Sequence, residues 1–195
     1  MAKIVLCSAS PRRQELLRHI GISDFDIRIP DADESVPAGL TAQETVQRIS
    51  RQKALAGRTL CADDEICITA DTMVFLDDVR LGKPADEADA LRMLTALQGR
   101  GHTVCTGVTV CRGEEMITEC ETTEVRFRAA SEQELLAYIR TGEPMDKAGA
   151  YGIQGGAALF AEKMHGDYYN VMGLPVCRLW QMLRSIAPEI MEDPL

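Results

Sequence analysis

The sequence of 195 residues has no long hydrophobic run. Its first apolar stretch, from Ile4 to Cys7, is too short to be the core of a signal peptide. No other stretch approaches the roughly 18 consecutive apolar residues of a membrane-spanning helix. These absences predict a protein without a membrane segment, located in the cytoplasm.

Positive charge is also in short supply. Lys and Arg number 21 against 30 Asp and Glu, which gives a formal net charge of −9 at pH 7. Proteins that follow a nucleic acid polymer carry the opposite excess, so such a polymer is excluded as the main partner. An anionic partner should instead be small and held by a local cluster of basic residues.

Several chemical signatures are missing as well. The seven cysteines include no C-x-x-C pair, which disfavours a disulfide framework and predicts reduced core residues. His19, His102 and His165 are isolated from one another, so a histidine metal site is not expected. The sequence lacks G-x-x-x-x-G-K-[ST], which excludes a Walker-type NTPase, and it shows no Ser-His or Cys-His pairing signature.

The residues that are present predict a folded α/β protein. Hydrophobic residues make up 46% of the chain and charged residues 26%, as in ordinary globular domains. Apolar periodicity, capping boxes and turn residues predict interleaved helices and strands in a single α/β domain over residues 1–195. Helices are expected at about 11–20, 41–57, 86–98, 131–141 and 174–186, and strands at about 3–7, 25–29, 66–76, 79–81, 102–111, 116–127 and 158–164. The two longest strands are expected to form a protruding antiparallel pair.

The first helix start carries two arginines where carboxylates are normally favoured. Ser10 and Pro11 are typical of an N-cap and a first helical position, so Arg12 and Arg13 stand at the positive end of the helix dipole. A phosphate bound over this turn would explain them, because guanidinium groups hold phosphate oxygens in a bidentate manner. The alternative is that both are solvated surface residues.

Asp71 is a carboxylate inside an apolar run of eleven residues. A buried carboxylate needs a cation, a metal or a cleft. If Asp77 and Asp78 form a two-residue turn, Lys83 lies at the same end of the hairpin as Asp71. A structural salt bridge with Lys83 and a joint role in holding a metal-bound polyphosphate are both open.

Glu34 and Lys53 are ordinary when taken singly. Glu34 lies in an acidic stretch that reads equally well as a solvated face, and Lys53 lies on a predicted helix. Together with Asp71, the arginines and Lys83, they form a set suited to phosphoryl transfer, in which two carboxylates hold Mg²⁺ or Mn²⁺ and cations neutralise phosphate oxygens.

A glycine-rich segment over residues 142–156 is expected to be a long unstructured loop with a function. Its glycines would let the backbone approach a planar ligand. The Gln154 amide carries a donor and an acceptor, which match the O4 and N3–H groups of uracil or thymine. The alternative is a plain surface loop.

Seven motifs along nearly the whole chain resemble the Maf family of nucleotide pyrophosphatases, in the branch that acts on dTTP and UTP. They are "SASPRRQELL" at 8–17, the acidic residue at 34, "RQKA" at 51–54, "ADT" at 70–72, "GKP" at 82–84, "EPMDKAGAYGIQG" at 143–155 and "NVMGLPV" at 170–176. The resemblance implies a two-lobed mixed sheet flanked by helices, similar to inosine triphosphate pyrophosphatases, and members that are often homodimers.

The resemblance also implies roles for individual residues. Asp71 is the proton acceptor, and Arg12, Thr72 and Gln154 are specificity positions. Further substrate-binding residues are Ser8, Ser10 and Arg13, further catalytic residues are Glu34, Lys53 and Lys83, and the metal would be held by Asp71 and Glu34. The implied reaction converts a pyrimidine nucleoside triphosphate to its monophosphate and pyrophosphate. Two alternatives remain: a nucleotide-binding regulator of cell division with little turnover, and an enzyme for modified nucleotides.

Overall fold

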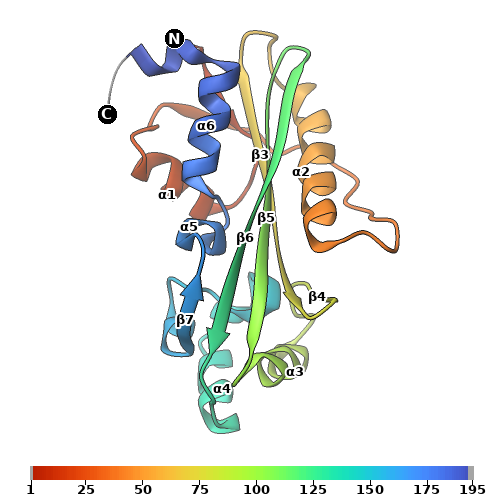
Figure 1. The fold of residues 1–195 in the computed structure, drawn as a ribbon, viewed down its shortest axis with the longest axis vertical. Helices are drawn as coiled ribbons and strands as arrows, with labels where there is room; N and C mark the ends of the chain where they lie inside the picture. The colour runs from red at the N-terminus through yellow and green to blue at the C-terminus, as the bar shows by residue number, and fades with distance from the viewer. Residues whose placement is uncertain (1, 193–195) are drawn as a thin grey trace.

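The computed structural model describes residues 2–192, and it contains one seven-stranded mixed sheet (Figure 1). Its strand order is β2-β1-β3-β5-β6-β7, with β4 added to β3. The strands are β1 (Ile4–Leu6), β2 (Phe25–Ile27), β3 (Ile66–Leu76), β4 (Val79–Leu81), β5 (Gly101–Arg112), β6 (Glu115–Phe127) and β7 (Ala161–His165). β1 is parallel to β2 and β3, and the other pairings are antiparallel. The predicted mixed α/β fold is confirmed.

Helices cover the sheet, and sequence signals fix where most of them begin. They are α1 (Pro11–His19), α2 (Ala42–Arg58), α3 (Glu87–Leu97), α4 (Glu132–Ile139), α5 (Tyr168–Met172) and α6 (Val176–Ile186), with short 3₁₀ segments η1 (Glu143–Asp146), η2 (Ala148–Ala150), η3 (Gly156–Leu159) and η4 (Pro188–Glu192). The capping boxes that begin at Thr41 and Ser131 both form. Within residues 2–192, no helix has the length and apolar character needed to cross a membrane.

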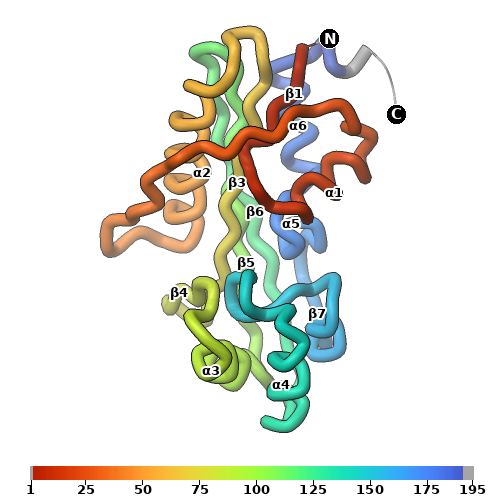
Figure 2. The backbone as a smooth tube through the Cα atoms, turned by 180° about the vertical axis from the view of Figure 1, so that it is seen from behind, coloured from red at the N-terminus to blue at the C-terminus, as the bar shows by residue number. Residues whose placement is uncertain are grey.

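The three longest strands, β3, β5 and β6, extend along the long axis of the molecule from one end toward the other (Figure 1). Figure 1 shows α2 on one side of β3 and β5, with α1, α5 and α6 on the other. Figure 2 shows β4, α3, α4 and β7 gathered at the opposite end of these strands from β1. The chain thus has two lobes that share β3, β5 and β6.

A gap in strand pairing separates these lobes. On the edge of β3 that faces away from β5, β1 pairs with Ile66–Ile68 and β4 pairs with Val74–Leu76. In the described chain, residues 69–73 of β3 therefore have no strand partner on this edge. Asp71 and Thr72 lie in this gap; Asp71 is buried and Thr72 is half-buried.

Close packing of α2 on the sheet depends on one glycine. Gly107 of β5 pairs with Asp71 of β3. A Cβ atom at residue 107 would lie 2.2 Å from the carbonyl oxygen of Val46 in α2. Because the residue has no side chain, the helix backbone can rest directly on the strand.

Several sequence expectations are corrected by the structure. The two longest strands do not protrude, because β5 pairs with β3 over nine positions and β6 pairs with β7. The segment 142–156 is not unstructured, since it contains η1 and η2 and ends where η3 begins. Residues 158–159 belong to η3, so the last strand begins only at Ala161. The short helix α5, which Asp167 caps, had no expected counterpart, and the final helix starts at Val176.

His102 is a buried histidine near the start of β5. Its ring lies edge-on to Phe127 and Tyr151, and its Nε2 atom is 2.8 Å from the Tyr151 hydroxyl. Its Nδ1 atom is buried without a partner in the described chain. Burial disfavours the charged ring and lowers the pKa of His102 to about 4.

This histidine should make the fold sensitive to mild acid. The unfolded chain binds a proton near the ordinary histidine pKa of 6.5, and the folded chain binds it only near 4. The free energy of unfolding should therefore fall as pH drops through this window, by about 3 kcal/mol from this group. We expect His102→Gln to remove this part of the slope in urea unfolding series, whereas His165→Gln, at an exposed site, should keep it. An unchanged slope in His102→Gln would contradict the assignment.

Candidate active site

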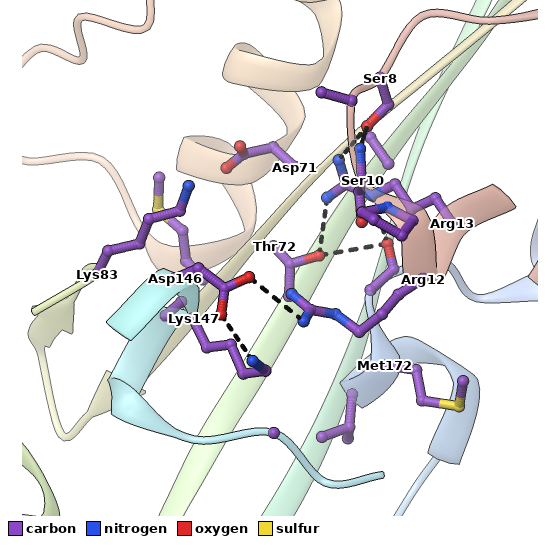
Figure 3. Close-up of a pocket in the computed structure, with 18 of the residues that line it drawn as sticks. Ser8, Ser10, Arg12, Arg13, Asp71, Thr72, Lys83, Asp146, Lys147 and Met172 are labelled. Carbon is purple, nitrogen blue, oxygen red and sulfur yellow. Dashed lines mark hydrogen bonds and ion pairs between the residues drawn. The ribbon is translucent and has the colours of Figure 1, made fainter. Parts of the chain in front are cut away.

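A cavity of about 950 Å³ lies at the gap between the lobes. Its walls come from the first turn of α1, the middle of β3, the segment after β4, the loop 143–155 and the end of α5. All ten residues singled out from the sequence line it: Ser8, Ser10, Arg12, Arg13, Glu34, Lys53, Asp71, Thr72, Lys83 and Gln154. Figure 3 shows Asp71 and Lys83 on one side, Arg13 and Ser8 on the other, and Thr72 between them.

Arg13 is a half-buried cation of this cavity. Its guanidinium donates to the Gly173 carbonyl at 2.9 Å, to Ser8 Oγ at 3.1 Å and to Thr72 Oγ1 at 3.2 Å (Figure 3). Burial lowers the pKa of Arg13, because removal from water disfavours its charge. Among residues 2–192, no carboxylate lies within 4.0 Å of it. The solvated-surface interpretation of Arg13 is therefore wrong, and its charge lacks an anionic partner.

The serines of the first turn act differently from the sequence expectation. Ser10 occupies the N-cap of α1, but its side chain makes no capping hydrogen bond. Its backbone N–H instead donates to Ser8 Oγ at 3.2 Å. Ser8 thus accepts from both the turn and Arg13, which fixes the turn against the arginine.

Arg12 lies at the rim of the cavity. Its Nη1 atom is 3.9 Å from Asp146 Oδ2, and a third of its side chain is exposed. Lys147 donates to the other oxygen of Asp146 at 2.6 Å and, as the largest cause, lowers the pKa of that carboxyl. Arg12 thereby reaches across the opening from α1 to η1, where its weakly held guanidinium faces solvent.

Asp71 is paired with a lysine, though not with Lys83. Lys53 Nζ of α2 donates to Asp71 Oδ1 at 2.7 Å and lies 3.1 Å from Glu34 Oε1. The second oxygen, Asp71 Oδ2, is buried and has no hydrogen-bond partner in the described chain. The predicted turn at Asp77 and Asp78 is confirmed by the pairing of Leu76 with Val79.

Lys83 lies on the cavity wall as an exposed side chain. No ion pair with it forms within residues 2–192. The structural salt bridge considered for it is therefore wrong, and its ammonium group remains available to a ligand.

Asp71 and Thr72 serve opposite faces of β3. Successive strand residues point to opposite faces, and Asp71 meets Lys53 of α2 while Thr72 meets Arg13 of α1. Thr72 Oγ1 is also 3.0 Å from Thr106 Oγ1, whose hydroxyl donates to a carbonyl of α5. The single cavity therefore reaches both faces of the sheet at its open edge.

Gln154 lies on an exposed bend whose position is fixed by buried neighbours. Glu143 accepts from the Tyr138 hydroxyl at 2.9 Å and from the Gly156 N–H at 2.9 Å. A Cβ at Gly155 would lie 2.2 Å from Glu143 Oε1. A side chain at this position would displace the Glu143 carboxylate, so the glycine keeps this local packing in place. The Gln154 side chain forms no hydrogen bond within residues 2–192 and is free to read a ligand edge.

Comparison with known proteins identifies the family of the chain. A family model described as Maf-like protein matches residues 3–186. This chain belongs to the Maf family.

Curated relatives of this Maf protein include a dTTP/UTP pyrophosphatase of Symbiobacterium thermophilum, 48% identical over 96% of this chain and 95% of that protein. Another, of Vibrio cholerae, is 47% identical over 95% of this chain and 98% of its own length. Among solved structures, a HAM1 protein from Coxiella burnetii is 14% identical, with a TM-score of 0.48 over 95% of this chain and 100% of that chain.

The Maf chain offers a suitable donor set for a hard divalent cation. Asp71 Oδ2 is a carboxylate oxygen without a partner in the described chain. Glu34 contacts the same lysine, Lys53, as Asp71 does, and its side chain is 56% exposed. Carboxylate and phosphate oxygens are the ligands that Mg²⁺ and Mn²⁺ prefer. The two carboxylates therefore fit the metal expected from the sequence, once ligand oxygens complete the coordination.

Three residues of the Maf site that were not singled out from the sequence make contacts that hold its walls together. Glu143 holds the Gln154 bend, Asp146 faces Arg12, and Lys147 donates to both the Glu143 carbonyl and Asp146. All three stand in the motif at 143–155, which signalled the loop as a whole. Glu143 has a partner on α4 and Asp146 has one on α1, so spacing along the chain alone could not assign these contacts.

Proposed function

We propose that this chain is a nucleoside triphosphate pyrophosphatase that acts on dTTP and UTP, with modified pyrimidine nucleotides as possible further substrates. The reaction joins water to the α-phosphorus and breaks its bond to the oxygen that bridges to the β-phosphorus. A nucleoside monophosphate and pyrophosphate leave. The single observation that carries this proposal is a buried carboxylate oxygen, Asp71 Oδ2, without a partner in the described chain, in one cavity with a half-buried arginine that no carboxylate of that chain pairs with.

Asp71 is the proposed general base. Lys53 occupies Asp71 Oδ1, which holds the carboxylate in one orientation and leaves Oδ2 to accept a proton from the attacking water. The ammonium group of Lys53 also lies beside Glu34, so it neutralises part of the negative charge around the phosphates. In this proposal the attack on the α-phosphorus takes place on the α2 side of β3, where Asp71 and Lys53 lie.

The phosphate chain is the proposed partner of the remaining cations. Arg13 and Arg12 offer N–H groups from α1, and Lys83 offers a flexible ammonium from the opposite wall. These charges stabilise the negative charge that develops on the leaving pyrophosphate. Ser8 and Ser10 shape the turn over which phosphate oxygens would lie.

A divalent cation, Mg²⁺ or Mn²⁺, is proposed to be held by Asp71 and Glu34. When bound, it would neutralise phosphate charge and lower the pKa of a water molecule. Glu34 would bind the cation from the exposed side of the cavity, and Lys53 would keep the Asp71 carboxylate oriented. A homodimer and a cytoplasmic location remain predictions.

The proposal is tested by product analysis with Mg²⁺ or Mn²⁺ over a panel of canonical and modified nucleoside triphosphates. We expect equal amounts of monophosphate and pyrophosphate, with dTTP and UTP preferred over purine nucleotides. Nucleotide-dependent thermal stabilisation without any product would instead identify a binding regulator. Release of inorganic phosphate in place of pyrophosphate would contradict attack at the α-phosphorus.

Gln154 should control which base is accepted. Its amide can pair with the O4 and N3–H groups of a pyrimidine, and no protein group competes for it within the described chain. For Gln154→Ala we expect the ratio of kcat/KM for dTTP over dATP to fall about tenfold or more, in keeping with one lost base-edge interaction. An unaltered ranking over the same panel would remove Gln154 from base recognition. Gln98→Ala, at a residue outside the cavity lining, is a matched control.

A further inference from the structure

Three cysteines meet behind the first turn of the cleft. Cys7 follows β1, Cys67 lies on the neighbouring strand β3, and Cys61 lies in the turn after α2. Their sulfur atoms all lie within 4.8 Å of one another. The Cys67 thiol is 3.4 Å from Cys7 Sγ, toward which it donates. Three separate segments of the chain thus bring thiols to one point.

The spacing of these sulfurs suits a metal ion. Zn²⁺ binds thiolate sulfur at about 2.3 Å in tetrahedral geometry, which separates two bound sulfurs by roughly 3.8 Å. The distance between Cys7 and Cys67 is already near this value, and the 4.8 Å limit of the group exceeds it by about 1 Å. Small side-chain rotations would therefore complete a three-sulfur site.

The residues packed around the three cysteines leave room for the sulfur atoms and are mostly apolar. A Cβ at Gly57 of α2 would lie 2.9 Å from Cys7 Sγ and 3.1 Å from Cys67 Sγ, so the helix approaches the thiols only because this residue has no side chain. Val5, Ala54 and Cys111 pack around the group. Cys61 is only half-buried, which gives an ion a path from the surface.

The three thiols differ in acidity. Burial raises the pKa of Cys61 to about 11, and hydrogen bonds with Cys111 and Cys7 raise the pKa of Cys67. The hydrogen bond from Cys67 lowers the pKa of Cys7, since it favours the Cys7 thiolate. One sulfur of the group is therefore prepared as the first ligand. Further thiols lose their protons to solvent as they bind the ion.

We propose that Cys7, Cys61 and Cys67 bind one thiophilic d¹⁰ cation, Zn²⁺ or Cu⁺. Thiolate ligands select these ions, whereas the carboxylates of the cleft suit Mg²⁺ or Mn²⁺. The two sites are chemically separate but structurally adjacent. Cys7 directly precedes Ser8, which accepts from Arg13, so an ion at the thiols is connected to the turn that faces the substrate cavity.

The test uses the reduced full-length protein with excess Mg²⁺ and no nucleotide, so that the carboxylate site does not compete. Zn²⁺ is titrated against a chromogenic chelator, and Cu⁺ is titrated separately under anaerobic conditions against a Cu⁺-specific chelator. We expect one equivalent of either ion per chain. Cd²⁺ should give an ultraviolet thiolate charge-transfer band of matching stoichiometry. Binding of only one of the two cations identifies the ion, and binding of neither overturns the proposal.

Variants assign the binding to this cluster. Cys61→Ser changes a half-buried residue and should weaken binding at least about 100-fold, beyond what loss of an outer-sphere partner costs. Cys177→Ser, at an exposed thiol on α6, should leave affinity unchanged. Zn²⁺ or Cu⁺ should raise the Tm of the wild type and of Cys177→Ser but not of Cys61→Ser. Cys7→Ser provides a second ligand variant should Cys61→Ser fold poorly. Full affinity in either ligand variant would contradict the assignment.

Discussion

Asp71→Asn is expected to lower kcat for dTTP about 10³-fold while KM changes little. The asparagine oxygen can still accept from Lys53, so the local packing is kept. The amide cannot take a proton from water, and loss of a general base typically costs between about 10² and 10⁴ in rate. The expected change corresponds to roughly 4 kcal/mol in the activation barrier.

The measurement is steady-state pyrophosphate release, together with nucleotide binding by calorimetry. Asp146→Asn is the matched control, because it makes the same chemical change at the rim, 3.9 Å from Arg12. That variant should alter KM by a few-fold and leave kcat nearly unchanged. If Asp71→Asn kept kcat within a few-fold of the wild type, Asp71 would not be the base.

Gly107→Ala should destabilise the fold and impair the site together. The added methyl would overlap the Val46 carbonyl, so α2 must move away from β5. Overpacking of this kind costs about 1–3 kcal/mol in the free energy of unfolding, and contact with a backbone rather than a flexible side chain points to the upper end. Because α2 carries Lys53, the same movement should lengthen its contact with Asp71 and lower kcat.

Urea unfolding and kcat measured on the same preparations test this coupling. Gly101→Ala is a matched control on the same strand, since a Cβ there meets nothing within 4 Å. It should change the free energy of unfolding by no more than about 0.5 kcal/mol and leave kcat unchanged. Wild-type stability and turnover in Gly107→Ala would show that the helix tolerates a wider spacing.

Local signals in the sequence were sufficient for most of the fold. The β-branched run at 66–76 gave β3 with its observed bounds, and the capping residues Thr41 and Ser131 gave the starts of α2 and α4. The failures have local causes too. Helix α5 has only five residues, too few for a periodic pattern to be recognised. The placement of β5 inside the sheet depends on pairing with β3, which no pattern within β5 encodes.

The site was predictable as a set of residues but not as a set of contacts. Asp71 stood out because a carboxylate inside a buried strand requires a partner, yet that partner is Lys53, which lies on a helix packed across the sheet. Two of the three partners of Arg13 are farther away still, since Thr72 and Gly173 are 59 and 160 residues away in sequence. Chemical character can be read along the chain, whereas the choice of partner is made by packing.

The unpaired edge of β3 fixes the relative backbone positions of Asp71 and Thr72. The proposed proton acceptor and the hydroxyl that holds Arg13 belong to consecutive residues, so their backbone positions are one strand rise of about 3.3 Å apart while their side chains point to opposite faces. Movement of the helices around the ligand does not change this backbone spacing. A nucleotide laid across the strand edge would therefore meet two adjacent backbone positions whose spacing stays the same when the lobes move.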